Sequence, residues 1–301
     1  MAFRARPYQN QAIRGVWSAL KNHASTLVVS PTGSGKCLAP GTQVMKFNGT
    51  SVAVEQIVPG DLLMGPDSKP RTVLSICTGE DEMYEIIPHD GAASYSVNSA
   101  HILSLRMTNQ GYSPGHRWHH DAVVNISVAE YLQTSKTFKH CAKGWRTGVE
   151  FPESAVDLDP YFLGLWLGDG HSYTQTIFSK DVEVEQFLQG MAKTYGLRFS
   201  KLDKPSMSCP ALAVVGVKKK ANPIRDALRE LNVIQNKHVP HAYKANSRRI
   251  RLEVLAGLLD SDGSLTRNGS FDFISSLKVL AEDVAWLARS VGLRASVQAA
   301  T

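Results

Sequence analysis

The 301-residue sequence lacks the features that mark membrane, secreted and zinc-binding proteins. It has no run of about 18 or more apolar residues, which a membrane-spanning helix needs, and its basic N-terminus lacks the apolar segment of a signal peptide. It has only four cysteines and no Cys-x-x-Cys pair, so neither a disulfide framework nor a zinc site is predicted. We therefore expect a cytoplasmic protein with no membrane partner, in a reducing setting that keeps a nucleophilic thiol from oxidation.

The formal net charge of +6 is spread unevenly along the chain. Residues 1–36 carry five basic and no acidic side chains, residues 37–159 have a net charge of −5, and residues 160–301 have a net charge of +6. Because nucleic acid attracts basic surfaces, only the last segment is a candidate for binding it by charge. The length allows two domains and a fragment.

Residues 31–36, with the sequence Pro-Thr-Gly-Ser-Gly-Lys, form a phosphate-binding motif that stops one residue early. Gly33 and Gly35 would let backbone N–H groups turn toward the phosphates, and Lys36 would reach the terminal ones. The next residue should be a Ser or Thr that binds Mg²⁺, but it is Cys37, and a thiol is a poor ligand for a hard cation. A β-rich stretch follows in place of the expected helix, so we predict an insertion at Cys37.

The segment before Cys37 resembles the opening of superfamily-2 helicases. Its Arg-Pro-Tyr-Gln sequence matches the adenine-recognition segment of that family, and a helical pattern and a β-run then lead into the glycine loop. The resemblance implies that four residues serve ATP binding in the complete helicase: Gln9, Gly33, Gly35 and Lys36. No Asp-Glu-x-His motif follows, so we expect that this chain does not hydrolyse ATP by itself.

Residues 37–155 are predicted to form an all-β domain of short strands separated by turns that contain Gly, Pro, Asn and Asp. The segment resembles the horseshoe-shaped Hint domain of inteins. Cys37 with the nearby Gly-Thr pair, the Val-Pro-Gly-Asp turn at 58–61 and the block at 95–101 carry this resemblance. That block usually reads Thr-x-x-His in the family. Here Asn98 occupies the Thr position and His101 the His position, so we expect an altered rate rather than lost function.

The resemblance implies self-catalysed protein splicing that starts at Cys37. Its thiolate is a good nucleophile for the carbonyl carbon of Lys36, which gives an N→S acyl shift. His101, with a near-neutral pKa, would protonate the departing amine. No terminal His-Asn pair is present, so we expect an N-terminal piece of a longer precursor or a truncated gene product, able to form the thioester but not to splice.

Residues 156–301 contain a unit that is used twice. Two helical patterns each end in Asp-Gly, and a Gly-Leu-Arg sequence follows the aspartate by 27 residues in the first copy and by 30 in the second. Small residues four apart, Gly164 with Gly168 and Gly257 with Ser261, would let the two helices approach closely. Parallel packing would then bring Asp169 and Asp262 together, and two adjacent carboxylates call for Mg²⁺.

This pattern resembles the LAGLIDADG (DOD-type) homing endonucleases, an α/β (α+β) fold with a pseudo-twofold repeat. The resemblance implies that Asp169 and Asp262 bind metal and that Lys237, in a Lys-x-x-Pro block, lies at the active site. Strands near 173–179, 198–215 and 267–275 would read bases in the major groove. Basic residues are proposed as phosphate contacts: Lys218, Lys219, Lys220, Lys244, Arg248, Arg249 and Arg251. The second copy is incomplete at Thr301.

These patterns together indicate a multidomain chain with three parts. Residues 1–36 start a helicase, residues 37–155 form the splicing domain, and residues 156–301 form an endonuclease nested in the intein. The expected partner is double-stranded DNA of the uninterrupted helicase gene, bound by a monomer. Two alternatives stay open, namely an ATP-binding helicase with a degenerate loop, or a DNA-binding remnant that no longer cuts.

Overall fold

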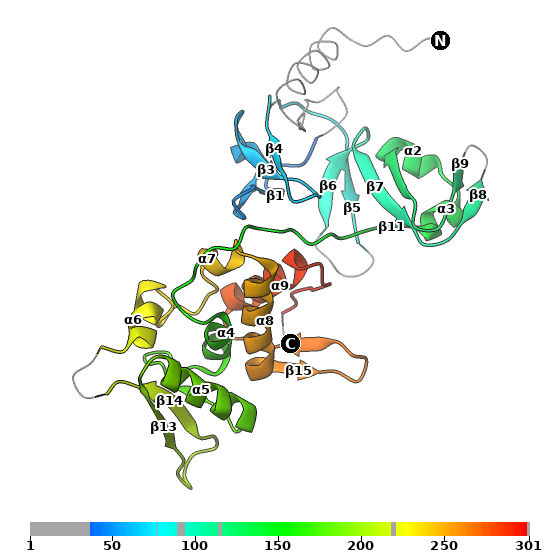
Figure 1. The fold of residues 1–301 in the computed structure, drawn as a ribbon. Coiled ribbons are helices and arrows are strands. Elements are labelled where there is room, and N and C mark those ends of the chain that lie inside the picture. Colours follow the sequence, from blue (N-terminus) through cyan, green and yellow to red (C-terminus); the bar gives the residue numbers. More distant parts are fainter. Residues whose placement is uncertain (1–36, 77, 89–93, 114–115, 218–220, 300–301) are drawn as a thin grey trace, which may run out of the picture. The chain divides into compact units, whose positions relative to one another are not determined.

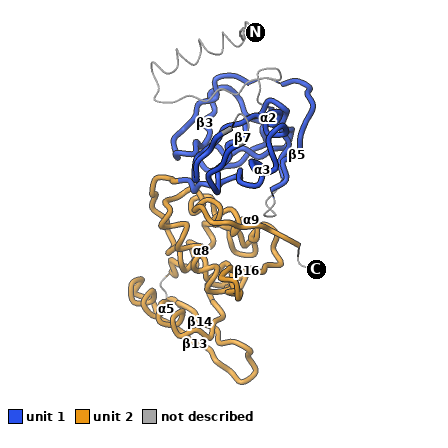
Figure 2. Tube along the Cα trace, turned by 90° about the vertical axis from the view of Figure 1, so that its right-hand side faces the viewer, with its two compact units in different colours: residues 1–149 blue, residues 150–301 orange. Residues whose placement is uncertain are grey.

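The computed structural model describes residues 37–76, 78–88, 94–113, 116–217 and 221–299. The chain divides into two compact units, residues 1–149 and 150–301 (Figure 2). No helix in the described ranges has the length and apolar character needed to cross a membrane. Gln9, Gly33, Gly35 and Lys36, predicted to bind ATP, lie outside the described residues.

The first unit is built from small antiparallel sheets (Figure 1). Four of them are strand pairs: β1 (Gln43–Met45) with β2 (Ser51–Ala53), β3 (Leu62–Met64) with β4 (Pro70–Thr72), β5 (Met83–Ile86) with β6 (Tyr95–Asn98), and β8 (Gly111–Ser113) with β9 (His116–Trp118). In a further sheet, β7 (Ile102–Met107) lies between β10 (Val123–Ser127) and β11 (Ala142–Gly144). A 3₁₀ turn spans Val54–Gln56.

Two short helices correct the expectation of a purely β domain. α2 spans Val128–Gln133 and α3 spans Lys136–Cys141. Ser127 and Glu130 form a reciprocal capping box at the start of α2, and the Ser135 hydroxyl accepts the Phe138 N–H at the start of α3. An alternating strand pattern gives no signal for such short helices. Their starting points are fixed instead by the capping side chains of Ser127 and Ser135.

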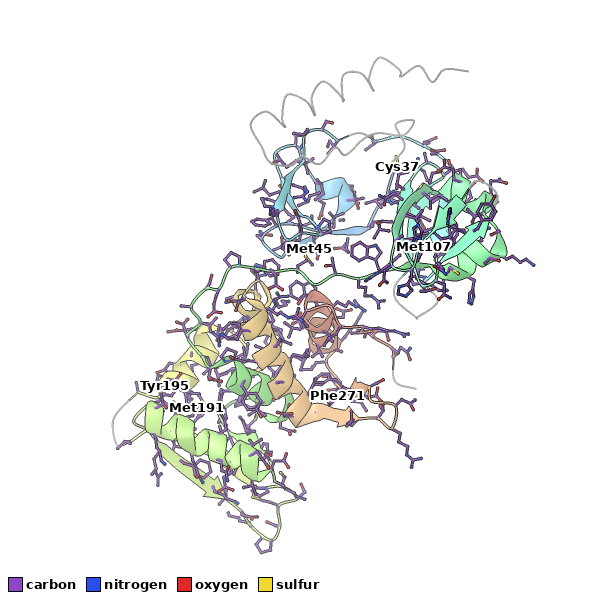
Figure 3. All side chains as sticks on the ribbon, turned by 45° about the vertical axis from the view of Figure 1, so that its right-hand side comes forward. Cys37, Met45, Met107, Met191, Tyr195 and Phe271 are labelled. Atoms are coloured by element: carbon purple, nitrogen blue, oxygen red, sulfur yellow. The ribbon has the colours of Figure 1, made fainter. Side chains whose placement is uncertain are left out.

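The core of the first unit lies mainly around β7. Val97, Met107 and Phe138 are each no more than 1% exposed, and Figure 3 shows Met107 among the packed side chains of this unit. The Trp118 and Phe138 rings meet edge to face, with their centroids 5.2 Å apart. This core holds β6 in place, and β6 ends at Asn98.

The second unit is organised around two helices, α4 (Pro160–Asp169) and α8 (Arg248–Asp262), that pack against each other along their length (Figure 1). Asp159 caps α4 by accepting the Phe162 N–H, with Pro160 at the first helical position. α8 begins at Arg248, because the Ser247 side chain caps it by accepting the Ile250 N–H. Most of α4 is buried on every side, so it forms the centre of this unit.

Strands and further helices surround this central pair. β12 (Ile177–Phe178), β14 (Ala211–Val215) and β13 (Arg198–Leu202) form an antiparallel sheet in that order, and α5 (Val182–Thr194) packs on β13 and β14. β15 (Gly263–Leu265) pairs with β16 (Phe271–Phe273). The unit also contains α6 (Pro223–Glu230), α7 (His241–Lys244) and α9 (Lys278–Ser290). Of the predicted first strand, 173–179, only Ile177 and Phe178 form a strand.

The order of elements after the two central helices is partly repeated. α4 is followed by a short bridge between Gly170 and Ile177 and then by α5, and α8 is followed by the β15–β16 hairpin and then by α9. α5 continues into β13 and β14, whereas residues 292–299 follow α9 without a helix or strand. The predicted repeat unit therefore recurs only through its second helix.

Candidate functional site

Cys37 lies beside the end of β6 in an antiparallel arrangement. The Asn98 N–H donates to the Cys37 carbonyl oxygen at 3.3 Å, and the Cys37 N–H donates to the Asn98 side-chain oxygen Oδ1 at 3.2 Å. The next residues continue the pairing, with a bridge between Leu38 and Val97 and a bond from the Ala39 N–H to the Ser96 carbonyl. Two hydrogen bonds thus hold the Cys37 backbone on one residue, Asn98.

The Asn98 side chain is fully buried and connects Cys37 to a second residue. Its Nδ2 donates to Asp81 Oδ2 at 3.0 Å. Because Asn98 pairs with Met83 across β5 and β6, Asp81 lies just beyond the end of the opposite strand. No local sequence pattern around Asp81 signals a partner for Asn98.

His101 lies in the tight turn that follows β6. Its N–H donates to the Asn98 carbonyl at 3.1 Å, and its own carbonyl accepts the Val128 N–H at 3.0 Å. The Ala129 N–H likewise donates to Ser99, so the start of α2 holds this turn. The predicted residues Cys37, Asn98 and His101 are therefore joined through Asn98, and the His101 Nδ1 atom is shielded from solvent.

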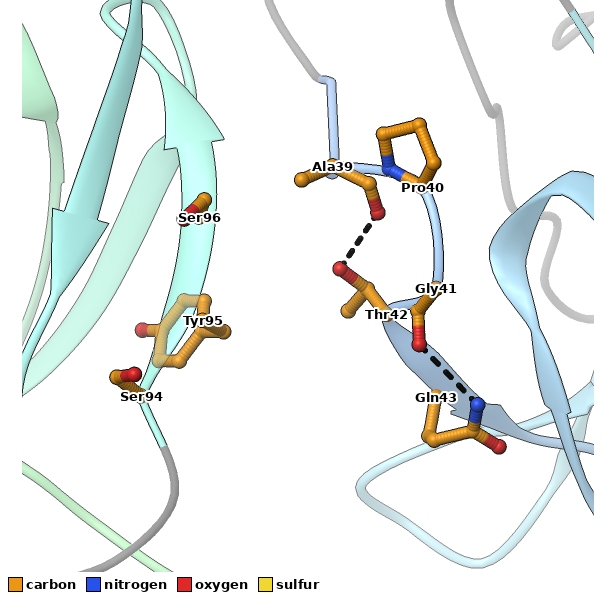
Figure 4. A pocket seen from close by; sticks show the side chains of 8 residues that line it. All are labelled: Ala39, Pro40, Gly41, Thr42, Gln43, Ser94, Tyr95 and Ser96. Carbon is orange, nitrogen blue, oxygen red and sulfur yellow. Dashed lines mark hydrogen bonds between the residues drawn. The ribbon is translucent and has the colours of Figure 1, made fainter.

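The Gly-Thr pair after Cys37 shapes one wall of a cavity. About 460 Å³ of space lies between residues 39–43 and 94–96 (Figure 4). Gly41 has φ +81°, a conformation that favours glycine, and the Thr42 hydroxyl donates to the Ala39 carbonyl at 2.7 Å. The Gly41 N–H donates to Glu55 at 2.8 Å and lowers the pKa of that carboxyl. This pair thus turns the chain shortly after Cys37.

The Val-Pro-Gly-Asp turn at 58–61 has a structural role. The Asp61 carboxylate accepts the Lys46 ammonium at 2.7 Å and the Val58 N–H at 3.1 Å, and these bonds lower the pKa of Asp61. Gly60, with φ +93°, provides the left-handed conformation that the turn requires. The motif therefore fixes a loop, and it contributes no reactive group to the site around Cys37.

In the second unit, Asp169 and Asp262 are the last residues of α4 and α8 and lie close together. A Cβ placed on Gly168 would be 3.3 Å from the Asp262 Oδ2 atom, so the Asp262 carboxylate lies beside the end of α4. Partial burial, and then the charge of Asp262, raise the pKa of Asp169; partial burial also raises the pKa of Asp262. The two acids carry mutually repelling charge at one end of the helix pair.

Lys237 completes this cluster from a distant part of the chain. Its Nζ donates to the Gly168 carbonyl at 2.7 Å and lies 5.4 Å from the centre of the buried Trp166 ring. Burial lowers the pKa of Lys237, while Asp262 and Asp169 act in the opposite direction. Separate motifs predicted Lys237, Asp169 and Asp262 as site residues. In the structure the three are neighbours.

A metal at this place would have two carboxylates as ligands. In the described ranges, no group of three or more His, Cys, Asp or Glu side chains is placed to hold a metal ion. Mg²⁺ often binds through one or two carboxylates and keeps several waters. Asp169 and Asp262 are hard oxygen donors at one end of a rigid helix pair, so the residues present fit such an ion.

Two residues of the predicted phosphate-contact cluster are bonded to partners inside the second unit. Lys244 pairs with Asp283 at 2.6 Å. Arg251 is fully buried and donates to the carbonyls of Asn246 and Ser290, each at 2.9 Å. Charge in the sequence did not reveal these internal partners. Three other members of the proposed set, Lys218, Lys219 and Lys220, lie outside the described residues.

Comparisons with known proteins found a family match within the chain and several similar proteins. Residues 37–155 match the model of the Hom_end-associated Hint family. The chain is 28% identical over 289 residues to the Replicative DNA helicase DnaB of Mycobacterium intracellulare, an alignment that covers 90% of this chain and 45% of that protein. It is also 33% identical over 79 residues to the V-type proton ATPase catalytic subunit of Candida tropicalis, covering 23% of this chain and 7% of that protein.

The family match supports an intein and implies protein splicing, and the first relative fits a helicase host. The chain spans less than half the length of either relative.

Proposed function

We propose that this chain belongs to an intein-containing helicase precursor with two activities. The splicing domain carries out an N→S acyl shift at the bond between Lys36 and Cys37, within the phosphate-binding loop of a superfamily-2 helicase. The second unit is a LAGLIDADG endonuclease that cuts double-stranded DNA of the uninterrupted helicase gene. Mg²⁺ serves the endonuclease, and ATP serves only the spliced helicase.

The observation that carries the splicing proposal is the reciprocal hydrogen bonding of Cys37 and Asn98. The bond to Asn98 Oδ1 fixes the Cys37 nitrogen, which is the leaving group of the acyl shift. Neither hydrogen bond involves the Cys37 sulfur. The Cys37 thiolate attacks the Lys36 carbonyl carbon, the C–S bond forms, the C–N bond breaks, and His101 gives a proton to the departing amine. The product is a thioester, with an α-amine on Cys37.

The cluster of Asp169, Asp262 and Lys237 supports the endonuclease proposal. Mg²⁺ bound there would stabilise the negative charge that develops on the scissile phosphate. The two carboxylates would hold the ion at the shared end of α4 and α8, and the Lys237 ammonium would add positive charge beside the phosphate. Trp166 and the Gly168 carbonyl keep that ammonium in place.

The splicing proposal is tested by intact-mass measurement of the chain with and without dithiothreitol. We expect a thiol-dependent product that ends at Lys36, together with a partner that begins at Cys37. Cys37→Ala must abolish both, whereas Cys209→Ala, in the other unit, must leave them unchanged. Cleavage that persists in Cys37→Ala would refute the acyl shift.

The endonuclease proposal is tested by nicking of a plasmid that carries the uninterrupted helicase gene, in the presence of Mg²⁺. Asp169→Asn and Asp262→Asn should stop nicking and retain binding. Asp260→Asn is the matched control, because it removes the same charge from α8 at a carboxylate that accepts the Tyr161 hydroxyl. Binding without nicking by the unmodified chain would instead identify a DNA-binding protein that no longer cuts.

A further inference from the structure

We propose that Asp81 is a positioning residue for the acyl shift, because it fixes the orientation of the Asn98 side chain that holds the Cys37 N–H. The inference rests on the proposed reaction at Cys37 and adds a residue to it. Neither the motifs of the sequence nor the family match singles out Asp81.

The two ends of the Asn98 amide have opposite hydrogen-bonding character. Oδ1 accepts from the Cys37 N–H at 3.2 Å, and Nδ2 donates to Asp81 Oδ2 at 3.0 Å. A flipped amide would place a donor against the Cys37 N–H and an acceptor against the carboxylate, so both bonds would be lost in a fully buried position. An ionised carboxylate only accepts, and it therefore decides which way the amide faces.

Asp81 is itself held in place for this task. Its second oxygen, Oδ1, accepts the N–H of Glu82 at 2.8 Å, which fixes the carboxylate against the backbone. The neighbouring acid cannot substitute for it, because the Glu82 carboxylate bonds the Tyr84 hydroxyl and raises the pKa of that tyrosine. Asp81 is thus the acid whose geometry matches the buried amide.

The arrangement bears on the chemistry at Cys37. A negative carboxylate polarises the Asn98 amide, and the amide oxygen then draws more strongly on the Cys37 N–H. Electron density rises on the nitrogen that must accept a proton when the C–N bond breaks. The same bond holds the Cys37 backbone in one orientation, so that the thiol and the Lys36 carbonyl meet in a constant geometry.

The pairing also accounts for an asparagine where the family usually has threonine. A threonine side chain ends in a single hydroxyl and is shorter than asparagine, whereas the amide reaches both the Cys37 N–H and the Asp81 carboxylate. Asp81 and Asn98 therefore act as one unit in this chain.

The test uses variants of the 301-residue chain in which Asp81 and Asn98 are replaced singly or exchanged for each other. It measures the rate of dithiothreitol-induced cleavage after Lys36. Asp81→Ala and Asn98→Asp should each slow cleavage about tenfold or more, since each leaves a polar group of the pair unmatched. The double variant Asp81→Asn/Asn98→Asp should regain most of the rate, because the new amide at 81 donates to the new carboxylate at 98. Glu80→Ala, an exposed acid next in the sequence, should cleave at the wild-type rate.

A second readout reports the bond directly. In protein labelled with ¹⁵N-cysteine, the amide resonance of Cys37 should move upfield in Asp81→Ala and stay in place in Glu80→Ala. Wild-type rate and an unmoved resonance in Asp81→Ala would overturn the proposal, as would a slow double variant.

The two proposals can fail separately. A wild-type chain that gives no cleavage refutes the acyl shift, and the Cys37 resonance then decides alone whether Asp81 orients the amide. A chain that cleaves normally without Asp81 refutes only the positioning role.

Discussion

Gly164 on α4 and Gly257 on α8 bring two helix backbones into direct contact. A Cβ on Gly257 would lie 3.0 Å from the Gly164 Cα and 2.7 Å from the Leu165 nitrogen, and even closer to the Tyr161 carbonyl. Four residues further along, Gly168 faces Ser261 in the same register, so the helices run parallel. This contact places Asp169 and Asp262 at one end of the pair.

Replacing Gly257 with alanine should destabilise the second unit. The added methyl has no space and forces the helices apart, at a cost of about 1–3 kcal/mol in the free energy of unfolding. Gly190→Ala is the matched control: it lies inside α5, where an added Cβ would have nothing within 4 Å, and alanine there should stabilise by about 0.5–1 kcal/mol. Urea denaturation of both variants measures the difference, and a Gly257→Ala protein of wild-type stability would show that the helices can separate freely.

Mg²⁺ should raise the melting temperature of the chain, because an ion that binds only the folded state stabilises that state by mass action. At a hundredfold excess over the dissociation constant, the stabilisation is about 2.7 kcal/mol. The increase should disappear in Asp169→Asn and in Asp262→Asn and persist in Asp260→Asn, whose carboxylate accepts the Tyr161 hydroxyl. Differential scanning calorimetry with and without Mg²⁺ gives the comparison. Equal increases in wild type and all three variants would place the ion elsewhere.

Local patterns predicted some of these features and missed others. Small residues four apart and the Asp-Gly ends predicted the close helix pair and its two neighbouring acids, because helix periodicity fixes which residues share a face. The contact between Asp81 and Asn98 could not be predicted, because it depends on the register of β5 against β6. The helix α2 begins at a Ser-x-x-Glu capping box, whereas α3 begins at Ser135 without a Glu at the corresponding position, and strand alternation signals neither helix.

Arg251 illustrates why charge alone was misleading, and its substitution gives a further test. Its buried guanidinium donates to Asn246 and Ser290 and lies 5.2 Å from the Phe151 ring. Arg251→Ala should therefore lower the free energy of unfolding by about 1.5–3 kcal/mol, the cost of hydrogen bonds made by a charged group. Arg248→Ala, at a half-exposed neighbour, should leave stability nearly unchanged. Weaker DNA binding by Arg251→Ala without loss of stability would restore its role as a phosphate contact.

Tyr243 should make the stability of the second unit sensitive to alkaline pH. Its hydroxyl donates to the Leu158 carbonyl at 2.8 Å and accepts the Leu158 N–H at 3.1 Å, and burial raises the pKa of Tyr243 from 10.0 to about 12. Below pH 10 the tyrosine is protonated in both states, so the stabilisation is fully present. Above pH 10 the Tyr243 hydroxyl loses its proton first in the unfolded chain. The free energy of unfolding therefore falls by up to about 2.7 kcal/mol as the pH rises to about 12.

Tyr243→Phe separates this effect from other alkaline titrations. Phenylalanine cannot ionise but leaves both polar groups of Leu158 without the hydroxyl, so the variant should be less stable than wild type at pH 8. Its stability should fall less steeply between pH 10 and 12, so that the difference between the two proteins narrows. Urea denaturation at stepped pH measures both curves. A constant difference across this range would mean that the Tyr243 hydroxyl ionises equally in the folded and unfolded chains.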